Sequence, residues 1–190
     1  DSSDFLAGKL NPSAEIIIDQ DSKRLQKLEP FEEWNKKDIQ GLRVLLKAEG
    51  KCTTDHVSPA GPWLKYRGHL ENISQNMYSG ALNAYTQSTG EAINTDTKEK
   101  GDIYEVAKYY SSNAIDWIAV ADENYGEGSS REHAAMEPRF MGCKIVLAKS
   151  FARIAQTNLK KQGILPLIFE NKSDYDKIEV FDTISTLNIN

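Results

Sequence analysis

The sequence predicts an α/β domain, because short apolar runs alternate with segments of helical periodicity along most of its 190 residues. Four runs have the length and the β-branched or aliphatic content of buried strands: residues 42–46, 117–121, 144–148 and 164–169. Strands that alternate with helices build parallel sheets, so we expect one such sheet to organise the chain.

The charge balance is that of an ordinary globular domain. Lys and Arg number 23 against 28 Asp and Glu, which gives a formal net charge of −5 at pH 7. Because no basic tail or basic face is apparent, nucleic acid is not a predicted partner. No apolar run approaches the ~20 residues of a membrane span, so we expect no membrane partner either.

The chain ahead of the first strand divides into two parts. Residues 1–21 combine Ser, Asp, Asn and Pro around a short Ile run, and we interpret them as an interdomain linker. Residues 22–41 are charged, with apolar side chains at helix-like spacing around Pro30, a stripe typical of core packing: Leu25, Leu28, Phe31 and Trp34. We therefore assign 22–190 to the domain.

A polar segment with Gly and Pro follows the first strand, at residues 50–70. Structured loops on rigid scaffolds carry function disproportionately, and this one contains residue types used in catalysis and metal binding: Asp55, His56, Arg67 and His69. Alternatively, Asp55 orients a backbone turn and Arg67 is a surface cation. The histidines and Cys52 do not have zinc-site spacing, so no metal ligands are predicted here.

The next elements alternate as the fold class requires. Residues 83–101 are polar and are predicted to be an exposed loop, whereas 102–110 places Ile103, Val106, Ala107 and Tyr110 on one helical face. After the strand at 144–148, a helix over 151–161 ends in basic residues before Gly163.

The most informative stretch is Tyr-Gly-Glu-Gly-Ser-Ser-Arg-Glu-His-Ala-Ala at 125–135. Its glycines allow a tight turn, and Ser129 with Glu132 has the spacing of a capping box, which predicts a helix start. A helix N-terminus suits a carboxylate or phosphate, and Arg131 can bind a carboxylate with two hydrogen bonds. The segment is either an anion site with Ser129 and Ser130 beside the bound group or a capped helix with solvated neighbours.

Several of these segments, taken together, resemble the C-terminal swivel domain of mitochondrial-type aconitase. The resemblance rests on GKCTTDHVSPAGPWLKYRGHLENIS at 50–74 and DENYGEGSSREHAAMEPRF at 122–140. It is supported by RLQKLEPFEEWNKKD at 24–38 and KSFARIAQTNLKKQGILPL at 149–167. It implies the swivelling β/β/α domain of the aconitase and isopropylmalate isomerase small-subunit type, here truncated at its C-terminus, with a sheet edge left open.

The resemblance implies a hydro-lyase of the tricarboxylic acid cycle in the mitochondrial matrix, which interconverts citrate and isocitrate through cis-aconitate. Its [4Fe-4S] cluster belongs to N-terminal domains that this chain lacks, so the chain has no cluster ligands and is expected to be inactive alone. By motif match, Ser129 is the catalytic base and Asp55 a catalytic-site aspartate, while Arg67, Ser130 and Arg131 bind substrate.

Two departures from the family pattern fall after Pro138. Phe140 stands where the family has a histidine and Cys143 where it has a glycine, and we expect changes in packing rather than in chemistry. Cys52 and Cys143 match no cluster cysteines and are predicted to be free, partly buried thiols. Two alternatives remain, a stand-alone small subunit of isopropylmalate isomerase and a non-enzymatic fragment in an assembly.

Overall fold

Four parallel strands organise the part of the chain that the computed structural model describes, residues 11–189. Neighbouring strands in the sheet are, in order, β1 (Leu42–Ala48), β6 (Trp117–Ala121), β7 (Cys143–Ala148) and β8 (Leu165–Ile168). All three pairings are parallel, which confirms the predicted α/β class and the four apolar runs as strands. β6 is buried at every position, as expected for a strand covered on both faces.

Short antiparallel strands extend this sheet. β2 (Leu82–Asn83) pairs with the end of β1 and with β3 (Ser88–Thr89), and β9 (Thr183–Ile184) pairs with the start of β1. β4 (Glu91–Ile93) and β5 (Lys100–Asp102) form a separate two-stranded sheet. The prediction of an exposed loop over 83–101 is therefore wrong.

Polar residues in this region are buried because they bond to the backbone around them. Asn83 is fully buried and its Nδ2 donates to the carbonyl of Glu91 at 2.9 Å. Asn94 Oδ1 accepts from the amides of Asp96 and Thr97. Composition alone predicts a solvated loop, because Asn and Thr are usually exposed, whereas here they satisfy tight turns.

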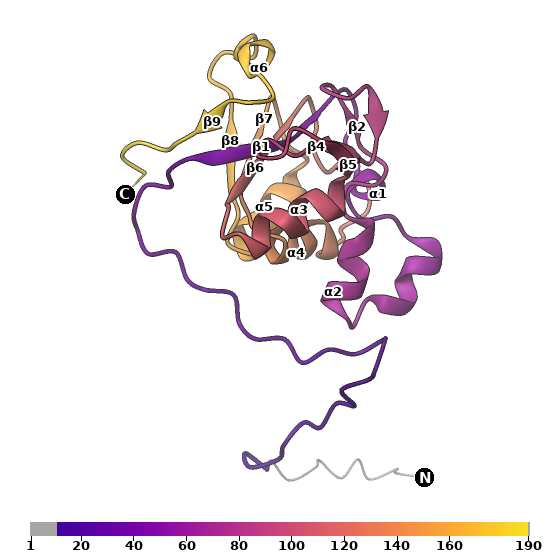
Figure 1. Cartoon of the computed structure of the whole chain (residues 1–190). Helices are drawn as coiled ribbons and strands as arrows, with labels where there is room; N and C mark the ends of the chain where they lie inside the picture. The colour runs from indigo at the N-terminus through magenta and orange to yellow at the C-terminus, as the bar shows by residue number, and fades with distance from the viewer. Residues whose placement is uncertain (1–10, 190) are drawn as a thin grey trace, which may run out of the picture.

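Three helices cover one face of the sheet: α3 (Ile103–Ser112), α4 (His133–Phe140) and α5 (Arg153–Lys161) (Figure 1). α3 buries the four side chains predicted for its inner face. The loop after β1 holds four shorter helices, which are α1 (Thr54–Val57), the 3₁₀ helix η1 (Gly61–Tyr66), α2 (Leu70–Ile73) and the 3₁₀ helix η2 (Ser74–Asn76). None of the helices among residues 11–189 has the length and apolar character that a membrane span needs.

The sheet separates two apolar layers. The larger layer lies under the helices and includes Trp117, whose Nε1 donates to the carbonyl of Met141 at 2.7 Å. Cys52 and Cys143 belong to it as free thiols, which confirms that prediction, although both are buried completely. Burial raises the pKa of each thiol to about 12, so both stay protonated. Phe140 packs against the edge of this layer.

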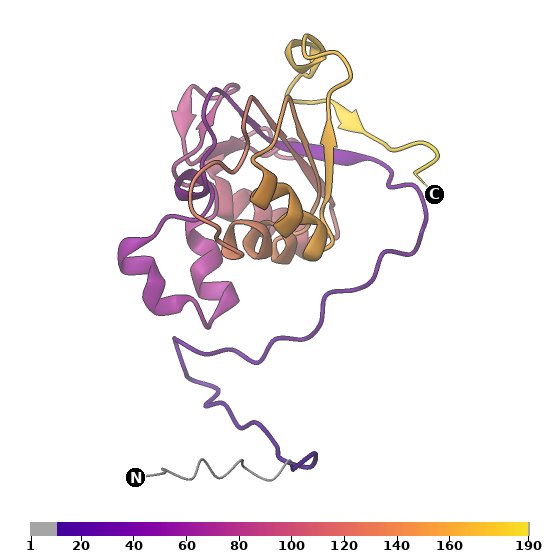
Figure 2. The same ribbon diagram turned by 180° about the vertical axis from the view of Figure 1, so that it is seen from behind.

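The other face of the sheet is covered by the end of the chain. α6 (Asp174–Lys177) lies there (Figure 2), where Phe169, Tyr175 and Ile178 pack on the sheet, and Tyr175 donates its hydroxyl to the carbonyl of Ala48 at 2.9 Å. β8 stands at one end of the sheet, and its Ile168 is exposed. The segment after Phe169 thus forms a helix and a strand that the sequence pattern did not indicate.

Residues 11–40, which we call the strap, lie outside the body of the domain and form no helix (Figures 1 and 2). The helix-like spacing of Leu25, Leu28 and Trp34 is misleading, because all three are exposed. Instead the strap makes an isolated bridge from Leu25 to Gly68, and Gln26 N donates to the Gly68 carbonyl at 2.9 Å. The division into a 1–21 linker and a 22–190 domain stays a prediction, and residues 1–10 lie outside the described part of the chain.

Candidate functional site

The site forms where the loops after β1 and β6 meet. These strands are parallel neighbours, so their carboxyl ends lie at the same edge of the sheet, where ligands bind in α/β folds. Two backbone hydrogen bonds join the loops: Gly126 N donates to the carbonyl of Cys52 at 2.7 Å, and Thr54 N donates to that of Glu127 at 3.0 Å. The two motifs that the sequence singled out are therefore one structural unit.

Two glycines allow this approach. Gly126 has φ +76°, and a Cβ there would lie 2.3 Å from Cβ of Ala155 in α5. Gly128 has φ +119°, and its Cβ would lie 3.0 Å from Thr54 Oγ1. Only glycine fits such conformations without strain, so the turn packs against α5 on one side and α1 on the other.

Ser129 does not begin a helix, so the predicted capping box is wrong. α4 begins at His133 and its N-cap is Glu132, which makes no side-chain capping bond. From Ser129 to Arg131 the chain turns too tightly for a helix, because Arg131 N donates to the carbonyl of Ser129 at 2.9 Å. Ser129 and Ser130 are exposed on this turn. The capping box of this site lies instead in α1, between Thr53 and His56.

Arg131 is held by groups from the other loop. Its Nη1 lies 2.6 Å from Oδ1 of Asp55 and donates to the carbonyl of Ser58 at 2.8 Å. The Arg131 side chain is 22% exposed and that of Asp55 is 65% exposed, so the pair lies at the rim of the domain. Charge-assisted bonds of this length fix the plane of the guanidinium, which leaves its other nitrogens for a carboxylate.

Beneath this pair lies a buried carboxyl that the sequence analysis did not single out. Glu137 in α4 is fully buried, and its Oε1 accepts a hydrogen bond from Ser58 Oγ at 2.8 Å. Burial raises its pKa to about 9, and the hydrogen bond from Ser58 and the charge of Arg131 oppose the shift only partly. The signal in the sequence was a glutamate among buried α4 positions: Ala134, Ala135 and Pro138.

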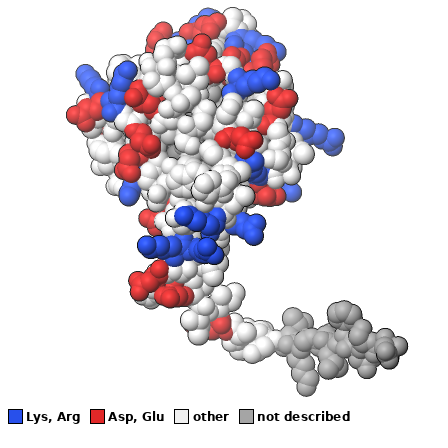
Figure 3. Space-filling view, turned by 90° about the vertical axis from the view of Figure 1, so that its right-hand side faces the viewer, with Lys and Arg blue, Asp and Glu red and all other residues white. Residues whose placement is uncertain are grey.

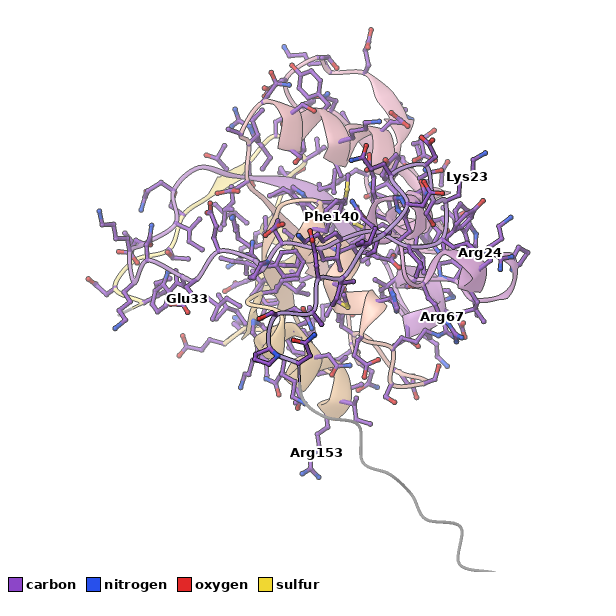
Figure 4. The ribbon with its side chains drawn as sticks, turned by 90° about the horizontal axis from the view of Figure 1, so that it is seen from below. Lys23, Arg24, Glu33, Arg67, Phe140 and Arg153 are labelled. Carbon is purple, nitrogen blue, oxygen red and sulfur yellow. The ribbon has the colours of Figure 1, made fainter. Side chains whose placement is uncertain are left out.

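Arg67 reaches the same region by another route. It follows η1, is exposed, and its backbone carbonyl accepts from His133 Nε2 at 2.8 Å, which ties it to the first turn of α4. Within residues 11–189 no hydrogen bond or ion pair involves its guanidinium. Figure 4 shows Arg67 on the side of the molecule where Lys23 and Arg24 of the strap lie. His133 is a second residue that sequence reasoning missed, although it lies inside the quoted motif.

A cavity of about 640 Å³ lies behind the turn, between α4 and α5. Ser129, Ser130 and Arg131 line it, together with Arg153 and Asn158 of α5, while Asp55 and Arg67 lie outside its lining. Arg153 projects at a different end of the domain from Arg67 (Figure 4). The volume of this cavity is in the range of small-molecule sites. The structure thus joins Asp55 with Arg131, next to both serines, and leaves Arg67 as a separate exposed cation.

On the face of the domain that Figure 3 shows, acidic and basic side chains are interspersed, and Lys and Arg gather where the strap meets the domain. Among residues 11–189, no three His, Cys, Asp or Glu side chains gather in a way that could hold a metal ion.

Comparison with known proteins connects this site to a family. The model of the aconitase C-terminal domain matches residues 42–172. A probable mitochondrial aconitate hydratase of Dictyostelium discoideum is 58% identical over 92% of this chain, which corresponds to 23% of that protein. The chain thus spans about a quarter of the length of such relatives.

Other relatives show how far substrates vary at this level of similarity. A mitochondrial homocitrate dehydratase of Saccharomyces cerevisiae is 55% identical over 95% of the chain, and the mitochondrial aconitate hydratase of the same yeast is 52% identical over 93%. Each match covers 23% of the relative.

A solved structure extends the likeness to the fold. A 3-isopropylmalate dehydratase from Methanocaldococcus jannaschii aligns with a TM-score of 0.51 and 26% identity, over 78% of this chain and 70% of that one. This supports the predicted swivelling α/β architecture, and the family model covers both loops of the site. The chain belongs to the aconitase C-terminal domain family.

Proposed function

We propose that this chain is the C-terminal part of a mitochondrial aconitate hydratase, a hydro-lyase of the tricarboxylic acid cycle that interconverts citrate and isocitrate through cis-aconitate. The observation that carries the proposal is the anchoring of Arg131 on Asp55 and Ser58, directly beside two exposed serines. An oriented guanidinium next to hydroxyl groups is an arrangement that binds a carboxylate and acts on the adjacent carbon.

In this proposal Ser129 is the base that removes a proton from the carbon beside a substrate carboxylate. A serine hydroxyl is far too weak an acid to ionise unaided, so its alkoxide needs nearby positive charge and N–H donors. Arg131 supplies positive charge two residues away, whereas α4 begins only at His133, so its N-terminal N–H groups are not placed at Ser129. Ser130, Arg131 and Arg67 bind the substrate carboxylates, and Asp55 orients Arg131.

The exposure of these groups supports a role as one half of a larger site. Ser129, Ser130, Asp55 and Arg67 all lie at the surface. Electrostatic stabilisation of a serine alkoxide is stronger when bulk water is excluded, so we propose that other domains cover this face in the complete enzyme. We propose that those domains also hold the [4Fe-4S] cluster. The described residues do not fit a cluster, because Cys52 and Cys143 are buried under the helices.

Two other substrates follow from the comparisons. Homocitrate is one candidate substrate for this chain, because the yeast homocitrate dehydratase is 55% identical to it and the yeast aconitate hydratase 52%. Isopropylmalate is the less favoured substrate, since the relative of that name is 26% identical. Several aconitate hydratases at 50–58% identity support citrate.

The test is turnover by the complete enzyme that carries this chain, with citrate, homocitrate and isopropylmalate compared under the same conditions. We expect citrate to have the highest kcat/KM and the 190-residue chain alone to be inactive. Turnover of homocitrate or isopropylmalate without turnover of citrate would reject the proposal.

A further inference from the structure

Glu137 is the one side chain of α4 that a packing argument does not explain. A carboxyl group with no exposed surface is costly to bury, and an aliphatic residue of similar size would fill the same space without that cost. Its Oε1 accepts from Ser58 Oγ, whereas its Oε2 is buried without a hydrogen-bond partner among the described residues.

Ser58 links this carboxyl to the candidate site. It is the C-cap of α1, its amide donates to the carbonyl of Thr54 at 2.9 Å, and Pro59 follows it. The Ser58 side chain bonds to Glu137 while its carbonyl accepts from Arg131 Nη1. One residue therefore holds α4 with its hydroxyl and the guanidinium with its backbone.

The contact to Glu137 needs only an acceptor. Ser58 Oγ–H donates and Oε1 accepts, so the contact does not depend on the ionisation of the carboxyl. The raised pKa of Glu137, which burial causes, agrees with a neutral group in this position. A glutamine has the same shape and the same acceptor, whereas methionine has the same length and lacks it.

We propose that Glu137 is a positioning residue for substrate binding: by accepting from Ser58 Oγ it fixes the Ser58 carbonyl, and this carbonyl orients Arg131. The inference rests on the proposed function, since it makes the orientation of Arg131 matter for citrate. It assigns to the buried carboxyl no contact with substrate and no proton transfer.

The test compares E137M with E137Q in the cluster-loaded complete enzyme. E137M is expected to raise the KM for citrate by about tenfold with kcat changed by less than about threefold, the pattern of a lost binding interaction. E137Q is expected to stay within about twofold of the wild type in KM, because the acceptor is kept. A residue that only stabilised the fold would change the thermal midpoint and the active fraction without moving KM.

A second pair of variants keeps the test decisive if E137M does not fold. S58A removes the same hydrogen bond from the other side, so it is expected to raise KM as E137M does, and the double variant is expected to be no worse than either single one. A normal KM in S58A would overturn the inference. So would an E137Q enzyme as impaired as E137M, because the carboxyl itself would then be required.

Crystal structures of E137M and E137Q separate this inference from the proposed function. We expect the contact of Arg131 Nη1 with the Ser58 carbonyl to persist in E137Q and to be lost in E137M. If that contact is unchanged in E137M, the inference is wrong whatever the substrate. If the contact is lost but the wild type does not turn over citrate, the proposed function fails and the link from Glu137 to Arg131 stands.

Discussion

The chain holds its two candidate carboxylate-binding arginines in opposite ways. Arg131 lies in a segment locked to α1 and α5, and its guanidinium is fixed by Asp55 and Ser58. Arg67 follows a 3₁₀ helix with no buried residue, and only its backbone is held: its carbonyl accepts from His133 and its amide donates to the carbonyl of Leu64. One arginine is preorganised, while the other keeps its side-chain freedom.

This difference has an energetic consequence for binding. Ordering a long side chain costs about 0.5–1.5 kcal/mol, which Arg67 loses on binding and Arg131 has largely lost in folding. A ligand is therefore expected to be oriented first by the locked segment. Arg67 would then close on the ligand, because within the described chain its guanidinium has no hydrogen bond or ion pair that must first break.

The largest expected effect tests whether the locked segment also carries the chemistry. Ser129→Ala should lower kcat by several orders of magnitude, at or above the ~10²–10⁴-fold typical of a lost general base, with little change in KM. Ser130→Ala is the matched control and should mainly raise KM. Exchange of the citrate methylene proton measures the step directly. A normal exchange rate in Ser129→Ala would place the base elsewhere.

The next effect tests the lock itself, through two glycines of similar conformation. Gly126 and Gly61 have φ of +76° and +69°, but a Cβ would lie 2.3 Å from Ala155 at Gly126 and meets nothing within 4 Å at Gly61. Gly61→Ala should cost only the backbone strain, about 1–2 kcal/mol. Gly126→Ala adds overpacking and should cost about 2–5 kcal/mol in total.

Thermal unfolding of the two glycine variants measures the difference, since 1 kcal/mol corresponds to about 2–4 °C in a protein of this size. Equal shifts in Tm would show that the contact of the turn with α5 does not lock the segment.

Much of the fold followed from the sequence because its signals are local. The four apolar runs became strands and α3 buried its predicted face, since period and β-branching report burial directly. The strap was misjudged because spacing alone cannot show whether a partner surface exists. The segment 83–101 was misjudged because its asparagines bond to turns formed by the segment itself.

The site was predicted in its residues but not in its connections. Ser129, Ser130 and Arg131 could be found because they stand between a glycine-rich turn and a helix-forming run and match a family motif, whereas the roles given to them stay predictions. The link from Glu137 through Ser58 to Arg131 joins residues far apart in the chain. The false capping box at Ser129 shows the same limit, because the tight turn before α4 depends on contacts with α1 and α5.

A smaller effect sharpens the contrast between the arginines. Lysine keeps the charge but loses the planar fork, so Arg67→Lys and Arg131→Lys should each weaken citrate binding by about 1–3 kcal/mol. Only Arg131→Lys should also lower Tm, because among residues 11–189 the guanidinium of Arg131 has partners and that of Arg67 has none. Michaelis constants and unfolding curves for both variants measure this. Ordinary KM values in both would make the arginines structural.

The smallest effect concerns how Arg67 is held. The Arg67 carbonyl can only accept, so its 2.8 Å contact with His133 requires a hydrogen on Nε2, which the ring carries in one neutral tautomer and when doubly protonated. A single hydrogen bond contributes about 0.5–1.5 kcal/mol, so His133→Ala should raise the citrate KM by about two- to tenfold. His133→Gln should restore part of the lost affinity, because the glutamine amide can donate to the same carbonyl.

Steady-state kinetics of both variants provide the measurement. Arg131 is the internal reference, because its contacts with Asp55 and Ser58 should be unchanged in a crystal structure of His133→Ala. If KM rises while those contacts are also lost, His133 acts on the whole of α4 and not on Arg67 alone.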